Sequence, residues 1–128
     1  MVFGFVAFSG LAARADARCA PISLTVDARQ SPFVVEAVLE RAGEVGQLRT
    51  MTVWKGGASA PAQFTLDARQ GRAWWPWHEP QNVGHRYLLF LRPVDGGGFT
   101  VRRCGASGEL SDGRRAELRA LGLRPQER

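Results

Sequence analysis

The residue types that carry chemistry are few in this sequence and lie in two places. Two cysteines stand far apart, Cys19 near the start of the chain and Cys104 near its end. The stretch GRAWWPWHEPQNVGH, residues 71–85, holds three of the four tryptophans and both histidines. Cysteines can form a disulfide, hold a metal or act as a nucleophile. Exposed tryptophans can stack on sugars or bases, or anchor a protein interface. These two places are the candidates for function.

The cysteine near the start, Cys19, admits four interpretations: a lipid anchor, a metal ligand, a free thiol or half of a disulfide. Its compartment bears on the choice, because residues 1–17 have the features of a secretory signal. Residues 2–13 are apolar and uncharged, and as a helix they would rise only ~18 Å, too little for a hydrocarbon core of ~30 Å. Ala15-Asp16-Ala17 is a small-x-small pattern typical of a cleavage site.

Cleavage after Ala17 would leave a mature chain that begins at Arg18. We therefore expect a secreted or periplasmic protein, with no stable membrane insertion once the signal is removed. The alternative is a buried N-terminal helix or strand, since no Lys or Arg precedes the apolar run. Export would place the cysteines in an oxidising compartment, where disulfides persist.

Charge gives no functional signal in this chain. The net charge is +5, carried by 16 Arg and one Lys against 12 acidic residues. A nucleic-acid site would cluster its basic residues. Here the arginines are scattered, and only Arg102-Arg103 and Arg114-Arg115 are adjacent. They are typical of solvated faces.

The elements that must position these residues are mostly strands. Residues 33–42 alternate, with Phe33 and Val35 on the face opposite Glu36, which is the period of a half-buried strand. Residues 85–93 form a continuous apolar run, typical of a strand buried on both sides. The expected strands are residues 33–42, 48–56, 62–68, 85–93 and 99–104. Residues 18–32 are expected to be irregular or weakly extended.

Only the end of the chain has a helical pattern. A helix is expected from an N-cap at Ser111 or Asp112 to Gly122, which suits the left-handed C′ position. Leu118 and Leu121 would share its buried face, and Arg115 and Arg119 would point outward. Residues 125–128 are expected to fray. The sequence thus predicts one all-β domain over residues 18–124, a five-stranded OB-type barrel with a closing C-terminal helix, or a small sandwich.

Several short motifs, taken together, resemble the N-terminal domain of tissue inhibitors of metalloproteinases and the related netrin-like and bacterial domains. They occur in the family's order and cover nearly all of residues 19–122. They are Cys19-Ala20-Pro21, FVVEAVLE at 33–40, VWKG at 53–56, RYLLFL at 86–91 and FTVRRCG at 99–105. The resemblance implies an OB-type barrel whose N-terminal segment is joined to the end of the fifth strand by a disulfide between Cys19 and Cys104.

Physical arguments agree with that disulfide. Closing a loop of about 85 residues stabilises a fold by up to ~4.5 kcal/mol in the chain-entropy model. Two cysteines in an exported chain are most simply explained as one pair. A bacterial lipid anchor would need a small residue before Cys19, where Arg18 stands. A metal site needs more soft ligands than the chain contains.

One departure from the family bears directly on activity. The inhibitors present Cys-x-Cys at the mature N-terminus, and the amine and carbonyl of the first cysteine chelate the protease zinc. The matching position here is Ala17, and residues 67–84 contain no cysteine to hold the N-terminal residue, Arg18, in place. An amine that is not held in place chelates weakly. Inhibition by zinc chelation is therefore not expected.

The remaining motifs give no catalytic constellation. His78-Glu79 and His85 fit no helix-face metal pair, and Ser107 and Ser111 lack a GxSxG elbow. We expect no enzyme activity, no metal and no cofactor. The tryptophans Trp74, Trp75 and Trp77 are either a plug for one mouth of the barrel or a contact surface, and burial is the usual state of tryptophan.

These observations predict an exported protein-binding module. Its contact residues would come from the N-terminal segment, Arg18, Ala20 and Pro21, and from the three tryptophans, with a metalloprotease as one candidate partner. The alternative is an OB-type module that binds an oligosaccharide, or a polyanion such as nucleic acid, through the tryptophan-rich loop.

Overall fold

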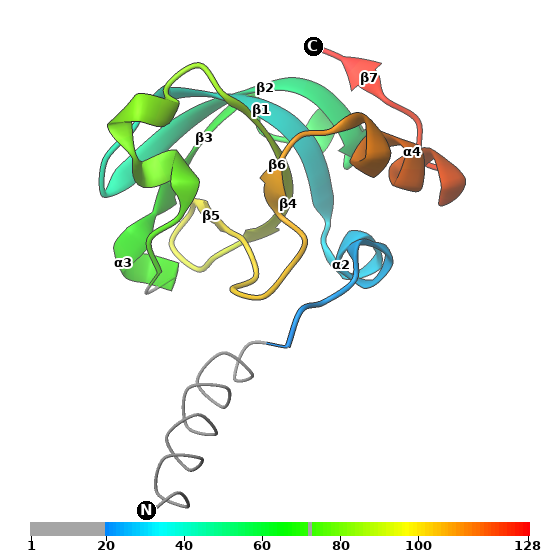
Figure 1. Ribbon diagram of the computed structural model, residues 1–128, viewed down its shortest axis with the longest axis horizontal. Helices are drawn as coiled ribbons and strands as arrows, with labels where there is room; N and C mark the ends of the chain where they lie inside the picture. The colour runs from blue at the N-terminus through cyan, green and yellow to red at the C-terminus, as the bar shows by residue number, and fades with distance from the viewer. Residues whose placement is uncertain (1–19, 72) are drawn as a thin grey trace, which may run out of the picture.

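The computed structural model describes residues 20–71 and 73–128 (Figure 1). The signal prediction for residues 1–17 and the predictions for Arg18 and Cys19 lie outside these residues. Within them, no helix is both long and apolar enough to cross a membrane.

Five strands close into a barrel (Figure 1). They are β1 (Phe33–Arg41), β2 (Val45–Lys55), β3 (Gln63–Asp67), β4 (Arg86–Pro93) and β5 (Phe99–Thr100). The order is β1-β2-β3-β5-β4, and β4 pairs back with β1, which completes the ring. All of these pairs are antiparallel except β3 with β5. The expected all-β, OB-type barrel with a C-terminal helix is confirmed.

Side chains that alternate along the strands fill the inside of the barrel. The period of two predicted for β1 is confirmed, because Val35, Ala37 and Leu39 all point into this core. The inner residues of the other strands include Leu48, Val53, Phe64, Leu66, Tyr87, Leu89 and Leu91. Trp77, which comes from the connection between β3 and β4, packs among them.

A second core covers the outside of β1 and β4. It joins Val34, Leu88 and Phe90 of the strands to Leu24 and Leu118 of two helices, α2 (Leu24–Gln30) and α4 (Asp112–Ala120). Figure 1 places both helices on the same side of the barrel. Because β4 has a core on each face, its apolar run is continuous, as the sequence predicted.

The helix α2 corrects the expectation of an irregular segment at residues 18–32. The Ser23 hydroxyl caps it by accepting from the Val26 N–H at 3.2 Å. The buried Asp27 carboxylate then accepts from the Ser31 hydroxyl at 3.0 Å and from the Ala106 N–H at 2.7 Å. The first of these hydrogen bonds closes the end of α2, and the second ties the helix to the loop that follows β5.

The C-terminal helix α4 begins and ends where the sequence predicted. Ser111 caps its first turn, and Gly122 has a φ of 88°. The prediction for Arg115 was wrong, because its guanidinium donates to the buried carboxylate of Glu36 at 2.9 and 3.0 Å. Arg119 lies over the ring of Trp54 at 5.5 Å.

The remaining differences concern element ends. Strand β2 begins at Val45 rather than at residue 48, and β5 stops at Thr100 rather than continuing to residue 104. Two short strands were not expected, β6 (Gly108–Glu109) beside β4 and β7 (Gln126–Glu127) beside β2. Residues 126–127 therefore pair with the barrel instead of fraying.

Candidate functional site

The connection between β3 and β4 carries the tryptophans; we call residues 73–84 the Trp loop. It follows α3 (Ala68–Gly71) and contains two short 3-10 helices, η2 (Pro76–His78) and η3 (Pro80–Asn82). Each 3-10 helix begins with a proline, whose ring fixes the backbone angle that the turn requires. The Asn82 side-chain amide donates to the carbonyl of Pro76 at 2.8 Å, linking the two turns. The loop is therefore held by its own contacts.

Trp77 anchors the loop inside the barrel. Its side chain is 0% exposed and meets the ring of Tyr87 edge-on, with 5.5 Å between ring centroids. Gly46 lets the Trp77 backbone approach β2, because a β-carbon there would come within 2.9 Å of the Trp77 carbonyl oxygen. Trp75 is half-buried and stacks on Trp77 at 4.9 Å. Trp77 is thus a plug, and it is not available to a partner.

His78 joins the loop to the turn between β1 and β2. Its ring is buried, and Nδ1 lies 2.8 Å from the carbonyl oxygen of Gly43. Because a carbonyl oxygen only accepts, Nδ1 carries the proton and donates. The Gly43 N–H donates in return to the His78 carbonyl at 3.1 Å. His78 is therefore a structural residue, and its ring supports the ring of Trp74, which packs against it.

Trp74 is the exposed member of the cluster. Its side chain is 56% exposed, while its ring lies against His78 with 5.0 Å between centroids. Its indole Nε1 donates to the Glu79 carboxylate at 2.5 Å. Of the large hydrophobic side chains that are exposed in the described part of the chain, Val26, Trp74 and Val83, two belong to the Trp loop. A large aromatic ring is thus presented to solvent in a fixed orientation.

The histidines do not form a metal site with other described residues. No cluster of three or more His, Cys, Asp or Glu side chains suited to a metal occurs within residues 20–71 and 73–128. His85 is instead exposed, with Nδ1 3.7 Å from the Glu109 carboxylate across the β4–β6 pair. The two histidines have different neighbours and different roles.

The N-terminal segment lies elsewhere. The Ile22 N–H donates to the Cys104 carbonyl at 2.8 Å, so the chain just after Cys19 runs beside Cys104. No free cysteine occurs among the described residues. Ala20 and Pro21 are exposed, and Figure 1 shows this segment entering beside α2, across the barrel from α3. The structure therefore does not join Ala20 and Pro21 to the Trp loop in one surface.

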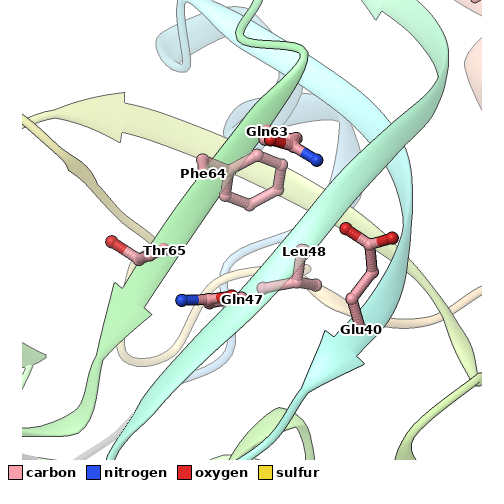
Figure 2. A pocket seen from close by; sticks show the side chains of 6 residues that line it. All are labelled: Glu40, Gln47, Leu48, Gln63, Phe64 and Thr65. Carbon is pink, nitrogen blue, oxygen red and sulfur yellow. The ribbon is translucent and has the colours of Figure 1, made fainter.

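A shallow pocket of about 250 Å3 lies on the β1–β2–β3 surface (Figure 2). Its lining residues are Glu40, Gln47, Leu48, Gln63, Phe64 and Thr65. This is the side on which OB-type barrels bind oligonucleotides and oligosaccharides. Phe64 is buried, however, and the Glu40 carboxylate is held by Arg49 at 3.0 Å. The pocket offers amide groups but no exposed ring on which a base or sugar could stack.

Comparison with models of protein families and with curated proteins finds no match to this chain. The likeness to metalloproteinase inhibitors therefore stays a prediction from the sequence motifs.

Sequence reasoning found the Trp loop but not the residues that decide how each tryptophan is used. The Gly43 carbonyl accepts from His78, and Gly46 leaves space for the Trp77 backbone, and no sequence pattern pointed to either contact. The one local signal was Glu79, an acidic residue five positions after Trp74, whose carboxylate accepts from the Trp74 indole.

Proposed function

We propose that this chain is an exported protein-binding module related to metalloproteinase inhibitors, and that Trp74 is the anchor of its contact surface. The observation that carries the proposal is the exposed ring of Trp74, which packs against His78 and donates to Glu79. Tryptophan is enriched among residues that dominate binding energy. A ring that is already ordered loses little conformational entropy when a partner covers it.

The alternative, an oligosaccharide or nucleic-acid binder, needs several exposed rings. Successive bases or sugars stack on successive aromatic faces. In the Trp loop, Trp75 and Trp77 stack on each other, and only Trp74 presents its ring to solvent. A single fixed anchor suits a protein interface better than a polymer groove.

Inhibition of a metalloprotease by zinc chelation is not part of the proposal. That mechanism needs a fixed amine at the N-terminal residue beside the loop between the third and fourth strands. Here Ala20 and Pro21 run next to Cys104 and α2. The disulfide between Cys19 and Cys104 belongs to the proposal as a structural staple, supported by the Ile22 hydrogen bond to the Cys104 carbonyl.

The test compares Trp74→Ala with Val26→Ala, which removes another exposed apolar side chain, on α2. Immobilised wild-type protein is exposed to the exported fraction of its source, and in parallel to heparin, single-stranded DNA and oligosaccharides. We expect one discrete protein partner whose binding weakens at least ~30-fold in Trp74→Ala and is unchanged in Val26→Ala. Retention of a polymer that depends on Trp74, or a protein partner indifferent to Trp74→Ala, would contradict the proposal.

A further inference from the structure

The second half of β2 has an edge that no barrel strand covers. Over residues 45–49 this edge pairs with β3, and the Thr50 N–H still reaches the Ala62 carbonyl at 2.8 Å. Beyond that point the only strand on this edge, within the described residues, is the two-residue β7. An open strand edge is a template for pairing with another extended segment.

The segment that occupies this edge is residues 124–128, which we call the tail. Thr52 pairs with Glu127 and Val53 pairs with Gln126, and the Arg128 N–H donates to the Met51 carbonyl at 2.9 Å. Glu127 also accepts from the Thr52 hydroxyl at 3.2 Å. The tail is thus an added antiparallel strand.

Alternate tail residues line a cavity beside α4. Pro125 and Glu127 lie two positions apart, so in an extended strand they share a face. Together with Glu36, Thr52, Trp54, Arg115 and Arg119 they line a cavity of about 210 Å3. Arg115 is engaged by Glu36, while Arg119 lies over the Trp54 ring and gives the cavity wall a positive charge. The cavity therefore suits a strand that carries a compact apolar side chain and, two positions later, an acidic side chain.

The tail is held mainly by hydrogen bonds, which include one from the Arg128 guanidinium to the Gly57 carbonyl at 3.0 Å. All five of its residues are exposed, so no large apolar side chain anchors it. A few hydrogen bonds, each small in net free energy, must offset the entropy of ordering five residues. Because these two contributions nearly cancel, the tail can be displaced by a partner segment that makes more contacts with the same edge.

We propose that residues 51–55 of β2, together with the cavity beside α4, form a binding site for an extended segment of a partner protein. The partner segment adds as an antiparallel strand and carries a Pro-x-Glu pattern, with its glutamate beside Thr52. The tail occupies the site within the same chain until the partner replaces it. Strand addition of this kind draws affinity from the main chain and specificity from alternate side chains. The site is separate from the Trp loop and does not depend on the function proposed for it.

The test uses the full chain labelled with 15N and a synthetic peptide of the sequence LRPQER. Gln126→Pro weakens the tail, because proline has no N–H to offer to its pairing partner Val53, and Gln126→Ala is the matched control. We expect the peptide to shift the amide signals of residues 51–55. It should bind Gln126→Pro about tenfold more tightly than wild type or Gln126→Ala, because the competing segment is weakened.

Two variants of the peptide test whether the site recognises the Pro-x-Glu pattern. Replacing the peptide glutamate by glutamine, or its proline by glycine, should weaken binding about tenfold. Absence of shifts at millimolar peptide in Gln126→Pro would overturn the proposal, as would equal binding of all three peptides. A wild-type chain that dimerises through its tail, with no response to added peptide, would identify a second copy as the occupant and also overturn it.

Discussion

Removing the Arg115 side chain should show how strongly α4 is held against the barrel. The Glu36 carboxylate is only 3% exposed and accepts three hydrogen bonds, one from the Trp54 indole at 2.9 Å and two from the Arg115 guanidinium. Arg115→Ala leaves a buried carboxylate with one neutral donor. Breaking a buried ion pair in this way costs about 3–5 kcal/mol. Because the Arg115 side chain is 31% exposed, water can enter, and we expect the lower end, about 3 kcal/mol.

The loss of unfolding free energy in Arg115→Ala should depend on pH. Burial raises the pKa of the Glu36 carboxyl, but hydrogen bonds from Arg115 and Trp54 and the Arg115 charge together hold that pKa below its usual value. The pair therefore stabilises the fold above the unfolded pKa of Glu36, and this contribution is lost as pH falls through the lower folded pKa. Without Arg115, burial dominates and raises the pKa of Glu36. The gap in stability between wild type and Arg115→Ala should narrow from pH 7 to pH 3.5.

The assay is thermal and urea unfolding followed by tryptophan fluorescence at both pH values. A loss of about 3 kcal/mol corresponds to a fall in Tm of ~12 °C for a domain of this size. A double-mutant cycle with Glu36→Gln isolates the pair, and we expect a coupling of about 2 kcal/mol. A loss under 1 kcal/mol at pH 7, or a gap that widens in acid, would refute the reasoning.

Other substitutions and the disulfide give further expectations. Trp77→Ala should lower the free energy of unfolding by about 3–5 kcal/mol, because it leaves a cavity in the barrel interior. Trp74→Ala should lower it by less than about 1 kcal/mol, because the Trp74 side chain is exposed. Urea unfolding of the two variants measures both losses. Gly46→Ala should cost about 1–3 kcal/mol in the same assay, since its β-carbon would press on the Trp77 carbonyl, and a neutral result would contradict that packing. Intact mass of the exported protein should show a start at Arg18 and two cysteines that resist alkylation until reduced. Free thiols, or a retained signal, would contradict the export and disulfide predictions.

Much of the barrel could be predicted because strand periodicity is a local property. The alternation in β1 and the continuous apolar run of β4 report directly which faces are buried. The helix α2 could not be predicted in this way, because it is only seven residues long and has the β-branched Thr25 and Val26 in its first turn. Its Asp27 is fixed by the backbone of Ala106, 79 residues away, which no local pattern reveals.

The candidate site shows the same division. The density of aromatic residues marked the Trp loop, but the fate of each tryptophan depends on contacts from distant strands. Trp77 is buried because its ring packs edge-on against Tyr87 inside the barrel, and because Gly46 lets the Trp77 backbone approach β2. Trp74 is exposed because His78, fixed by Gly43, lies beneath it. Sequence spacing alone cannot distinguish these two outcomes.

Site-specific photo-crosslinking tests the central claim, that the Trp loop contacts a protein partner, most directly. A photo-reactive residue is placed at the exposed Gln81 in η3, or at the exposed Val26 in α2 as control, in wild-type and Trp74→Ala backgrounds. The exported protein is then irradiated in its native compartment. The account predicts one discrete protein adduct from position 81 that disappears in Trp74→Ala, and no such adduct from position 26. Adducts that are equal from both positions, or that persist without Trp74, would contradict it.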